Sequence, residues 1–152
     1  MLRIIFFFLA FWSCNKSREE NIILDVKTIV NKTATETESI IGTPDSTYTL
    51  RILGKPIFCQ MYQKYHIEIQ YPDNLATDIV VYGAHDLPFN QTALKAFNID
   101  YKVHHPKEYI KDRLIRWFDV EDFSTISFYN PRIDSAGNVS NFNIFFKARP
   151  LE

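Results

Sequence analysis

The sequence predicts a β-rich α+β fold, in which an antiparallel sheet is packed by one main helix. Residues Ile57–Tyr71 alternate between apolar and polar side chains, as in a strand with one solvated face. Two further alternating segments, Ser124–Tyr129 and Val139–Lys147, flank a turn that contains Gly137, as in a β-hairpin. Pro106–Phe118 places apolar residues at helical spacing. An all-β sandwich is the alternative if that helix is only a crossover.

The chain begins with the plan of a secretory signal. Arg3 is followed by an apolar run, Ile4–Trp12, and then by the small residue Ser13. That order matches the cationic region, apolar region and cleavage site of a signal peptide. The run is much shorter than the roughly 20 apolar residues that a membrane-spanning helix needs. We therefore expect residues 1–13 to be a signal peptide.

A cysteine, Cys14, directly follows this small residue. Phe11-Trp12-Ser13-Cys14 resembles the lipobox of bacterial lipoproteins, most closely the relaxed form of the Bacteroidota, although Phe11 and Trp12 replace the usual leucine and small or aliphatic residue. The resemblance implies cleavage before Cys14, which would carry acyl chains and anchor the protein in the bacterial cell envelope, at the outer membrane. The alternative is an ordinary export signal, or a mistaken start codon, with a chance cysteine.

Residues 14–20 are short and polar, so we expect a lipidated tether, followed by a single β-rich globular domain over residues 21–152. The chain is 46% hydrophobic and 23% charged, which favours a folded domain. Its formal net charge of −1 argues against nucleic acid as a partner. If Cys14 is lipidated, the other cysteine, Cys59, has no partner, and we expect it to be a buried apolar filler.

The first half of this domain is predicted to be mostly strand. Ile22–Val30 has one apolar parity and predicts a first strand, and residues 31–47 predict a loop. Tyr48–Leu53 and Asp78–Tyr82 predict further strands. Along the long alternating strand, one parity is assigned to the core; it comprises Ile57, Cys59, Met61, Tyr65, Ile67, Ile69 and Tyr71.

Two helical segments are predicted in the second half. Asp86–Phe97 predicts a short helix with Leu94 and Phe97 directed inward, and Ile99–His104 returns to a strand pattern. The main helix, Pro106–Phe118, begins with proline and contains a favourable i, i+4 pair, Asp112 and Arg116. Its core stripe consists of Ile110, Leu114, Trp117 and Phe118.

The sequence predicts no catalytic residue, cofactor site or metal site. His104 and His105 are adjacent, so on a strand they would point to opposite faces. His66 and His85 are interpreted as solvated side chains, and no metal-ligand spacing such as CxxC or HExxH occurs. The acidic pair Glu121-Asp122 is interpreted as exposed, and no GxSxG motif occurs.

One candidate modification site lies in the predicted hairpin turn. Asp134-Ser135-Ala136 resembles the acceptor motif of Bacteroidota O-glycosylation, which implies a sugar on Ser135. The turn is too short for an EF-hand calcium loop, and turn formation explains its composition.

These features predict a non-catalytic binding or accessory lipoprotein, attached to the membrane through Cys14 and acting on a protein partner. The anchor and the aromatic content of 15% favour this class, because aromatic side chains are enriched at contact surfaces. One alternative is a toxin-neutralising immunity or inhibitor lipoprotein. Another is a small periplasmic hydrolase, which a pocket containing His85, Asp86 and other polar groups would favour.

Overall fold

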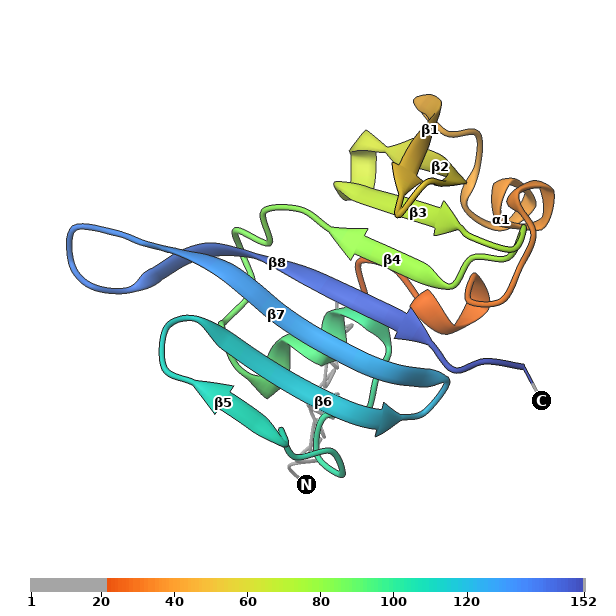
Figure 1. Ribbon diagram of the computed structural model, residues 1–152. Helices are drawn as coiled ribbons and strands as arrows, with labels where there is room; N and C mark the ends of the chain where they lie inside the picture. The colour runs from red at the N-terminus through yellow and green to blue at the C-terminus, as the bar shows by residue number, and fades with distance from the viewer. Residues whose placement is uncertain (1–21, 152) are drawn as a thin grey trace, which may run out of the picture.

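The computed structural model describes residues 22–151, which form one eight-stranded sheet with strand order β1-β2-β3-β4-β8-β7-β6-β5 (Figure 1). The strands are β1 (Ser46–Ile52), β2 (Lys55–Tyr62), β3 (Ile67–Tyr71), β4 (Asp78–Val81), β5 (Glu108–Ile110), β6 (Leu114–Val120), β7 (Phe123–Ile133) and β8 (Val139–Ala148). All seven neighbouring pairs are antiparallel, which confirms the predicted β-rich antiparallel fold. The strands of the described region form one sheet, whereas a sandwich needs two.

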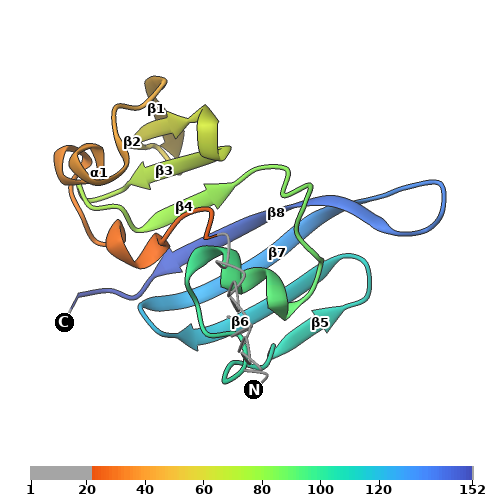
Figure 2. The same cartoon turned by 180° about the vertical axis from the view of Figure 1, so that it is seen from behind.

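Short helical segments cover one face of this sheet. They are η1 (Val26–Thr28), α1 (Ala34–Ile41) and η3 (Gln91–Phe97), and a fourth segment, η2 (Gln63–Tyr65), joins β2 to β3. Figure 2 shows η1 and η3 in front of the sheet, and Figure 1 shows them behind it. Leu94 and Phe97 of η3 are fully buried, as predicted, and the Phe97 ring lies 5.1 Å from the ring of Phe146.

We call the side beneath these segments the covered face. Cross-strand partners point to the same side of a sheet, so the strand register identifies its members. One unbroken row crosses five strands and consists of Ile69, Ile79, Phe146, Ile126 and Trp117. All five side chains are fully buried, so this row is the centre of the hydrophobic core.

The predicted main helix is wrong, because Pro106–Phe118 forms β5, a turn and the start of β6. The N–H of Arg113 donates to the carbonyl of Ile110 at 3.0 Å and closes the turn. Within the turn, Asp112 adopts the left-handed conformation, with φ 54°. The apolar spacing that fits a helix also arises from two short strands separated by a turn. Arg116 therefore pairs with Glu108 across the strands at 2.8 Å, and not with Asp112.

Three further predictions for irregular or strand regions are wrong. Residues 22–30 contain η1 where a strand was expected, because the Asp25 side chain accepts from the N–H of Lys27 and caps a short helix. Residues 31–47 contain α1, which starts with a capping box between Thr33 and Glu36. The spacing of Thr33 and Glu36 is typical of a helix start, but the many polar residues around them suggested a loop. Residues 99–104 form turns and irregular structure where a strand was expected.

The long strand predicted over Ile57–Tyr71 is divided into two strands, β2 and β3. Side chains of the same parity therefore point to opposite faces of the sheet in the two strands. Tyr62 pairs with Ile67, with η2 and the left-handed His66 between them. Odd-numbered residues of β2 therefore face away from the helices, whereas odd-numbered residues of β3 face them. Cys59 is buried as predicted, but it pairs with Gln70 on the side opposite Ile67 and Ile69, so the predicted common face is wrong.

The C-terminal hairpin is confirmed. β7 and β8 pair along most of their length, and the turn Asp134–Asn138 joins them, with Gly137 at φ 84°. The hairpin projects beyond the rest of the sheet, as Figure 1 shows in blue. The predicted strands at Tyr48–Leu53 and Asp78–Tyr82 are also confirmed as β1 and β4.

Candidate functional site

The side of the sheet opposite the covered face has no helix of the described region packed on it, and we call it the open face. The strand register places on it, among others, Tyr48, Cys59, Glu68, Gln70, Val80, Leu114, Arg116, Phe118, Ser127, Tyr129 and Phe145. Several of these side chains are buried by their neighbours on the same face, but the aromatic rings of Phe118, Tyr129 and Phe145 remain partly exposed and are available to a partner.

A buried carboxyl group organises one half of the open face. Glu68 of β3 is only 4% exposed, and its Oε2 accepts hydrogen bonds from the hydroxyls of Tyr48 and Tyr82, the latter at 3.0 Å. Its Oε1 accepts from Nε2 of Gln70 at 2.6 Å. These four residues form what we call the Glu68 cluster. Their hydrogen bonds hold two tyrosine rings in fixed positions, Tyr48 on β1 and Tyr82 directly after β4.

Burial raises the pKa of Tyr48 and of Tyr82 well above the usual tyrosine range, and the hydrogen bond and negative charge of Glu68 raise them further. Both hydroxyls therefore remain protonated donors at physiological pH. Burial also raises the pKa of the neighbouring Cys59 thiol, again with a contribution from Glu68. A protonated thiol is a poor nucleophile, so Cys59 is suited to packing and not to covalent chemistry.

Aromatic side chains continue across the other half of the open face. Tyr129 and Phe145 are half-buried, and Phe118 is 44% exposed. Burial raises the pKa of Tyr129, while a hydrogen bond from Asn143 lowers it. The open face therefore combines large apolar contact area with hydroxyl groups whose positions are fixed by bonds within the protein.

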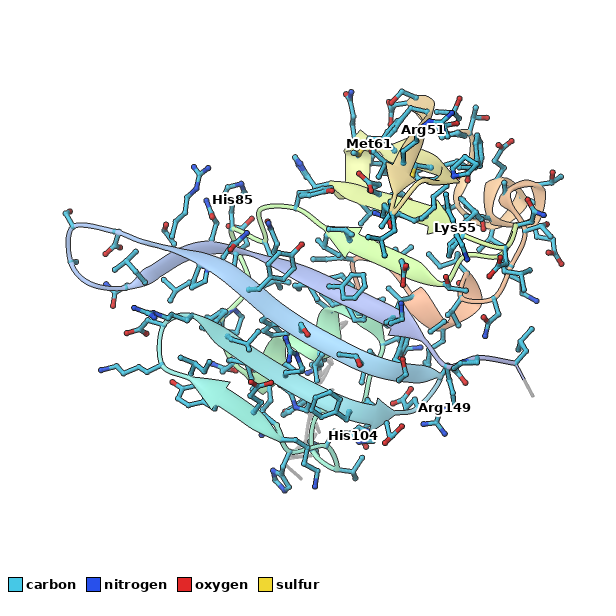
Figure 3. The ribbon with its side chains drawn as sticks, in the orientation of Figure 1. Arg51, Lys55, Met61, His85, His104 and Arg149 are labelled. Carbon is cyan, nitrogen blue, oxygen red and sulfur yellow. The ribbon has the colours of Figure 1, made fainter. Side chains whose placement is uncertain are left out.

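At one edge, the open face ends in a groove of about 510 Å³. It is lined by His66, Tyr82, Gly83, His85, Asn130, Arg132, Asn141 and Asn143. These residues come from three places: the β2–β3 connection, the segment after β4, and the base of the β7–β8 hairpin. Figure 3 labels His85 on the side where that hairpin projects. Tyr82 belongs to both the groove and the Glu68 cluster, so the two features are continuous.

Backbone hydrogen bonds fix the wall that follows β4. The N–H of Tyr82 donates to the carbonyl of His66 at 2.8 Å, and the N–H of Gly83 donates to Oδ1 of Asn143 at 3.0 Å. Gly83 has φ +59°, and a Cβ atom there would lie 3.1 Å from Nε2 of His85. The imidazole of His85 therefore packs against a position that only glycine can occupy without strain.

A β-bulge shapes the opposite wall. Tyr129 pairs with Asn143, but the next pair is Arg132 with Asn141, so β7 contains one extra residue at this point. Asn130 within the bulge is left-handed, at φ 51°. Bulges redirect side chains and are common next to functional sites. Here the bulge allows both Asn130 and Arg132 to line the groove.

A smaller hollow of about 170 Å³ adjoins this groove. Both hollows are lined by His66, Tyr82 and His85, and Asp86 lines only the smaller one. The structure thus brings together two histidines that the sequence treated as separate solvated side chains. No motif spacing could reveal this, because the antiparallel pairing of β3 with β4 brings the residue before β3 next to the segment after β4.

The other candidate residues lie elsewhere. Ser135 is exposed at the hairpin tip, where Oδ1 of Asp134 accepts from the N–H groups of Ala136 and Asn138. Glu121 lies in the β6–β7 turn, 3.0 Å from Nζ of Lys27 and 4.0 Å from Nε2 of His104. Cys14, the predicted lipidation site, lies outside the described residues.

Within residues 22–151, no three His, Cys, Asp or Glu side chains gather closely enough to hold a metal ion. No helix of the same region is long and apolar enough to span a bilayer. The chain matches no protein-family model, no curated protein and no solved structure. Any functional conclusion therefore depends on the chemistry of the open face and its groove.

Proposed function

We propose that this chain is a lipid-anchored binding protein of the bacterial cell envelope, which holds a partner on the open face and performs no chemistry on it. The observation that carries the proposal is the Glu68 cluster. Two tyrosines, Tyr48 and Tyr82, are fixed by hydrogen bonds to one buried carboxyl group. A surface ordered in advance loses little side-chain entropy on binding, which favours affinity.

The composition of the open face supports the same conclusion. Phe118, Tyr129 and Phe145 lie on three adjacent strands, β6, β7 and β8, and expose part of each ring. Tyrosine and phenylalanine supply large contact areas with few rotatable bonds, and they are enriched at protein interfaces. Such a face suits contact with another macromolecule.

The point at which the chain enters the fold fits an anchor that leaves this face free. The N–H of Ile23 donates to the carbonyl of Ala96 at 2.8 Å, and Ala96 belongs to η3 on the covered face. The first described residues therefore lie on the covered side of the sheet, opposite the open face.

The anchor is tested by labelling cells with an alkyne fatty acid. We expect the wild-type protein to incorporate the label and Cys14→Ser to incorporate none. A wild-type protein without label would exclude the lipoprotein part of the proposal.

The binding face is tested by photo-crosslinking in intact cells. A photoreactive phenylalanine analogue replaces Phe118 on the open face in one strain and Tyr109 in another. Tyr109 is 62% exposed, and its partner Ile115 points to the covered side, so it is a matched control. We expect a discrete crosslinked product from position 118 only. Equal crosslinking at both positions, or none at either, would contradict the proposal.

A small hydrolase is the second candidate, because His66 and His85 line one groove and Asp86 lines the adjoining hollow. Imidazole and carboxyl groups are the usual general acids and bases. This candidate requires a product: a compound bound in the groove should be cleaved over time, and His85→Gln should abolish the cleavage. Recovery of the compound unchanged would support the binding protein.

A further inference from the structure

We propose that the groove at the base of the β7–β8 hairpin binds a saccharide that carries a carboxylate group. This inference deepens the proposed function, since it assigns a ligand class to one part of the same surface. Three observations support it. The first is which side chains line the groove, and the second is which of them have hydrogen-bonding groups that no other part of the protein uses. The third is which kinds of side chain the lining lacks.

The charge of the groove favours an anion. Arg132 is the one lining residue with a permanent charge, and neither aspartate nor glutamate lines the groove. Arg132 has no ion pair within residues 22–151, and the nearby Asp134 is already used by the hairpin turn. A guanidinium group binds a carboxylate through two parallel hydrogen bonds, which gives both strength and orientation.

The carboxamides of the groove favour hydroxyl groups beside that carboxylate. Asn130 and Asn141 make no side-chain hydrogen bond within the described region, so each offers one acceptor and two donors. Asn143 is held in place, because its Oδ1 accepts from Gly83. A sugar ring presents several hydroxyls that both donate and accept, and amide side chains match that pattern.

The remaining residues complete this set. Tyr82 is 38% exposed, and its hydroxyl is tied to Glu68, so its ring is a fixed element of the wall. His66 and His85 add imidazole groups that can donate or accept. The volume, about 510 Å³, lies in the usual range for small-molecule sites.

Two other ligand classes fit this groove less well. A hard cation such as calcium would need carboxylate ligands, and none lines the groove. His66 and His85 could supply two imidazole ligands to a softer metal, but no third His, Cys, Asp or Glu of residues 22–151 lies close enough to complete a site. A peptide hot spot needs a pocket for an apolar anchor, yet the lining contains no aliphatic side chain. The aromatic half of the open face, which lies outside the groove, is better suited to a protein partner.

The experiment is a calorimetric titration of the full lipidated protein in detergent. The probes are trigalacturonate and trimannuronate, which differ in hydroxyl stereochemistry, and the control is the neutral trisaccharide galactotriose. We expect saturable binding of at least one uronate, about tenfold or more tighter than the neutral sugar. Equal affinity for galactotriose, or no binding of either uronate, would overturn the proposal.

Two variants and one further probe sharpen this test. Arg132→Gln should weaken uronate binding about tenfold or more without lowering the unfolding midpoint, because Arg132 is exposed and unpaired. Arg149→Gln is the matched control, since Arg149 is also exposed but lies outside the groove, as its position far from His85 in Figure 3 shows. Its Nη2 lies 3.9 Å from Oδ1 of Asp119. The affinity of this control variant should equal that of the wild type.

A peptide of three glutamates separates recognition of a sugar from recognition of a carboxylate alone. Binding as tight as that of the uronates would overturn the saccharide assignment. Crosslinking at Phe118 remains an independent result, because that side chain lies outside the groove. A failed uronate titration with positive crosslinking would therefore reject the ligand class and leave the proposed function standing.

Discussion

The two faces of the sheet bury their residues by different means. On the covered face, aromatic rings pack on one another. The ring centroid of Phe146 lies 5.1 Å from that of Phe97 and 5.4 Å from that of Phe123, and the centroids of Trp117 and Phe128 are 4.8 Å apart. On the open face no described helix intervenes, yet Glu68 is nearly inaccessible and Cys59 is fully so.

The difference shows that burial alone does not identify a structural core. On the covered face, burial mainly removes apolar surface from water, which is the main driving force for folding. The buried polar side chain of Gln60, which accepts from the hydroxyls of Tyr62 and Tyr71, lies there beneath α1. On the open face, burial accompanies hydrogen bonds from Tyr48 and Tyr82 to a carboxyl group, an arrangement that fixes positions more than it stabilises. The proposed binding face therefore rests on a polar group that is buried without a covering layer.

The largest expected effect comes from two adjacent residues of β8 that point to opposite faces. Phe146→Ala should lower the free energy of unfolding by about 3–5 kcal/mol, because it leaves a cavity beside Phe97 and Phe123. Phe145→Ala, on the open face, should cost about 1 kcal/mol. Urea unfolding of both variants checks this. Equal losses would show that the two faces contribute alike.

A second comparison concerns the two glutamates of the open face. Glu68→Gln should cost about 1.5–3 kcal/mol, because an amide cannot accept all three bonds that the buried carboxyl oxygens accept. Glu108→Gln removes the solvated pair with Arg116 and should cost less than about 1 kcal/mol. Urea melts at neutral pH measure both. A loss for Glu108→Gln as large as that for Glu68→Gln would count against the Glu68 cluster.

A third, smaller effect should appear at alkaline pH. The pKa of Tyr48 and of Tyr82 is raised in the folded state above the ordinary value of 10.0. Above about pH 10 these two tyrosines therefore lose protons more readily in the unfolded chain than in the native one. The stability that their raised pKa values contribute is complete below about pH 10 and is lost as the pH rises further. On the covered side, burial likewise raises the pKa of Tyr71 to about 12.

Tyr82→Phe isolates the contribution of the open face to this pH dependence. The variant lacks one of the titrating hydroxyls, so its stability should fall less steeply than that of the wild type above about pH 10. Urea melts between about pH 9 and pH 11 measure the two slopes. Parallel slopes would mean that the Tyr82 hydroxyl is not perturbed by its surroundings.

The sequence predicts those parts of the fold in which local pattern and tertiary contacts agree. Alternation and a glycine turn define the β7–β8 hairpin, and the inward positions of Leu94 and Phe97 also follow from spacing. The spacing in Pro106–Phe118 is ambiguous, because it fits a helix and a strand pair equally. Pairing of β6 with β7 decides between them, and that contact is not local.

The candidate site is harder to predict, because its position depends on where strands are interrupted. The left-handed His66 reverses the facing of β3 relative to β2, and the extra residue near Asn130 redirects β7. Neither event has a distinct sequence signal. The groove also joins residues that are far apart in sequence, such as His66 and Arg132, through the order of the strands.

The last prediction concerns the reactivity of the Cys59 thiol, which distinguishes the two faces with little change in stability. Cys59→Ala should be tolerated at about 1 kcal/mol, since it removes only a small side chain. In a Cys14→Ser background, Cys59 is the single thiol of the chain. Burial and the raised pKa should make it resist a maleimide reagent until the protein unfolds.

The facing of Cys59 can then be tested without unfolding the protein. Tyr48 is the cross-strand partner of Cys59 on the open face, so Tyr48→Ala should accelerate native labelling, because it removes a ring next to the thiol. Tyr62 belongs to the same strand, β2, but faces the helices, so Tyr62→Phe should leave the labelling rate unchanged. The reverse result would place Cys59 on the covered face. It would also remove the distinction between the two faces, because the thiol would then be protected by the helices and not by the side chains around Glu68.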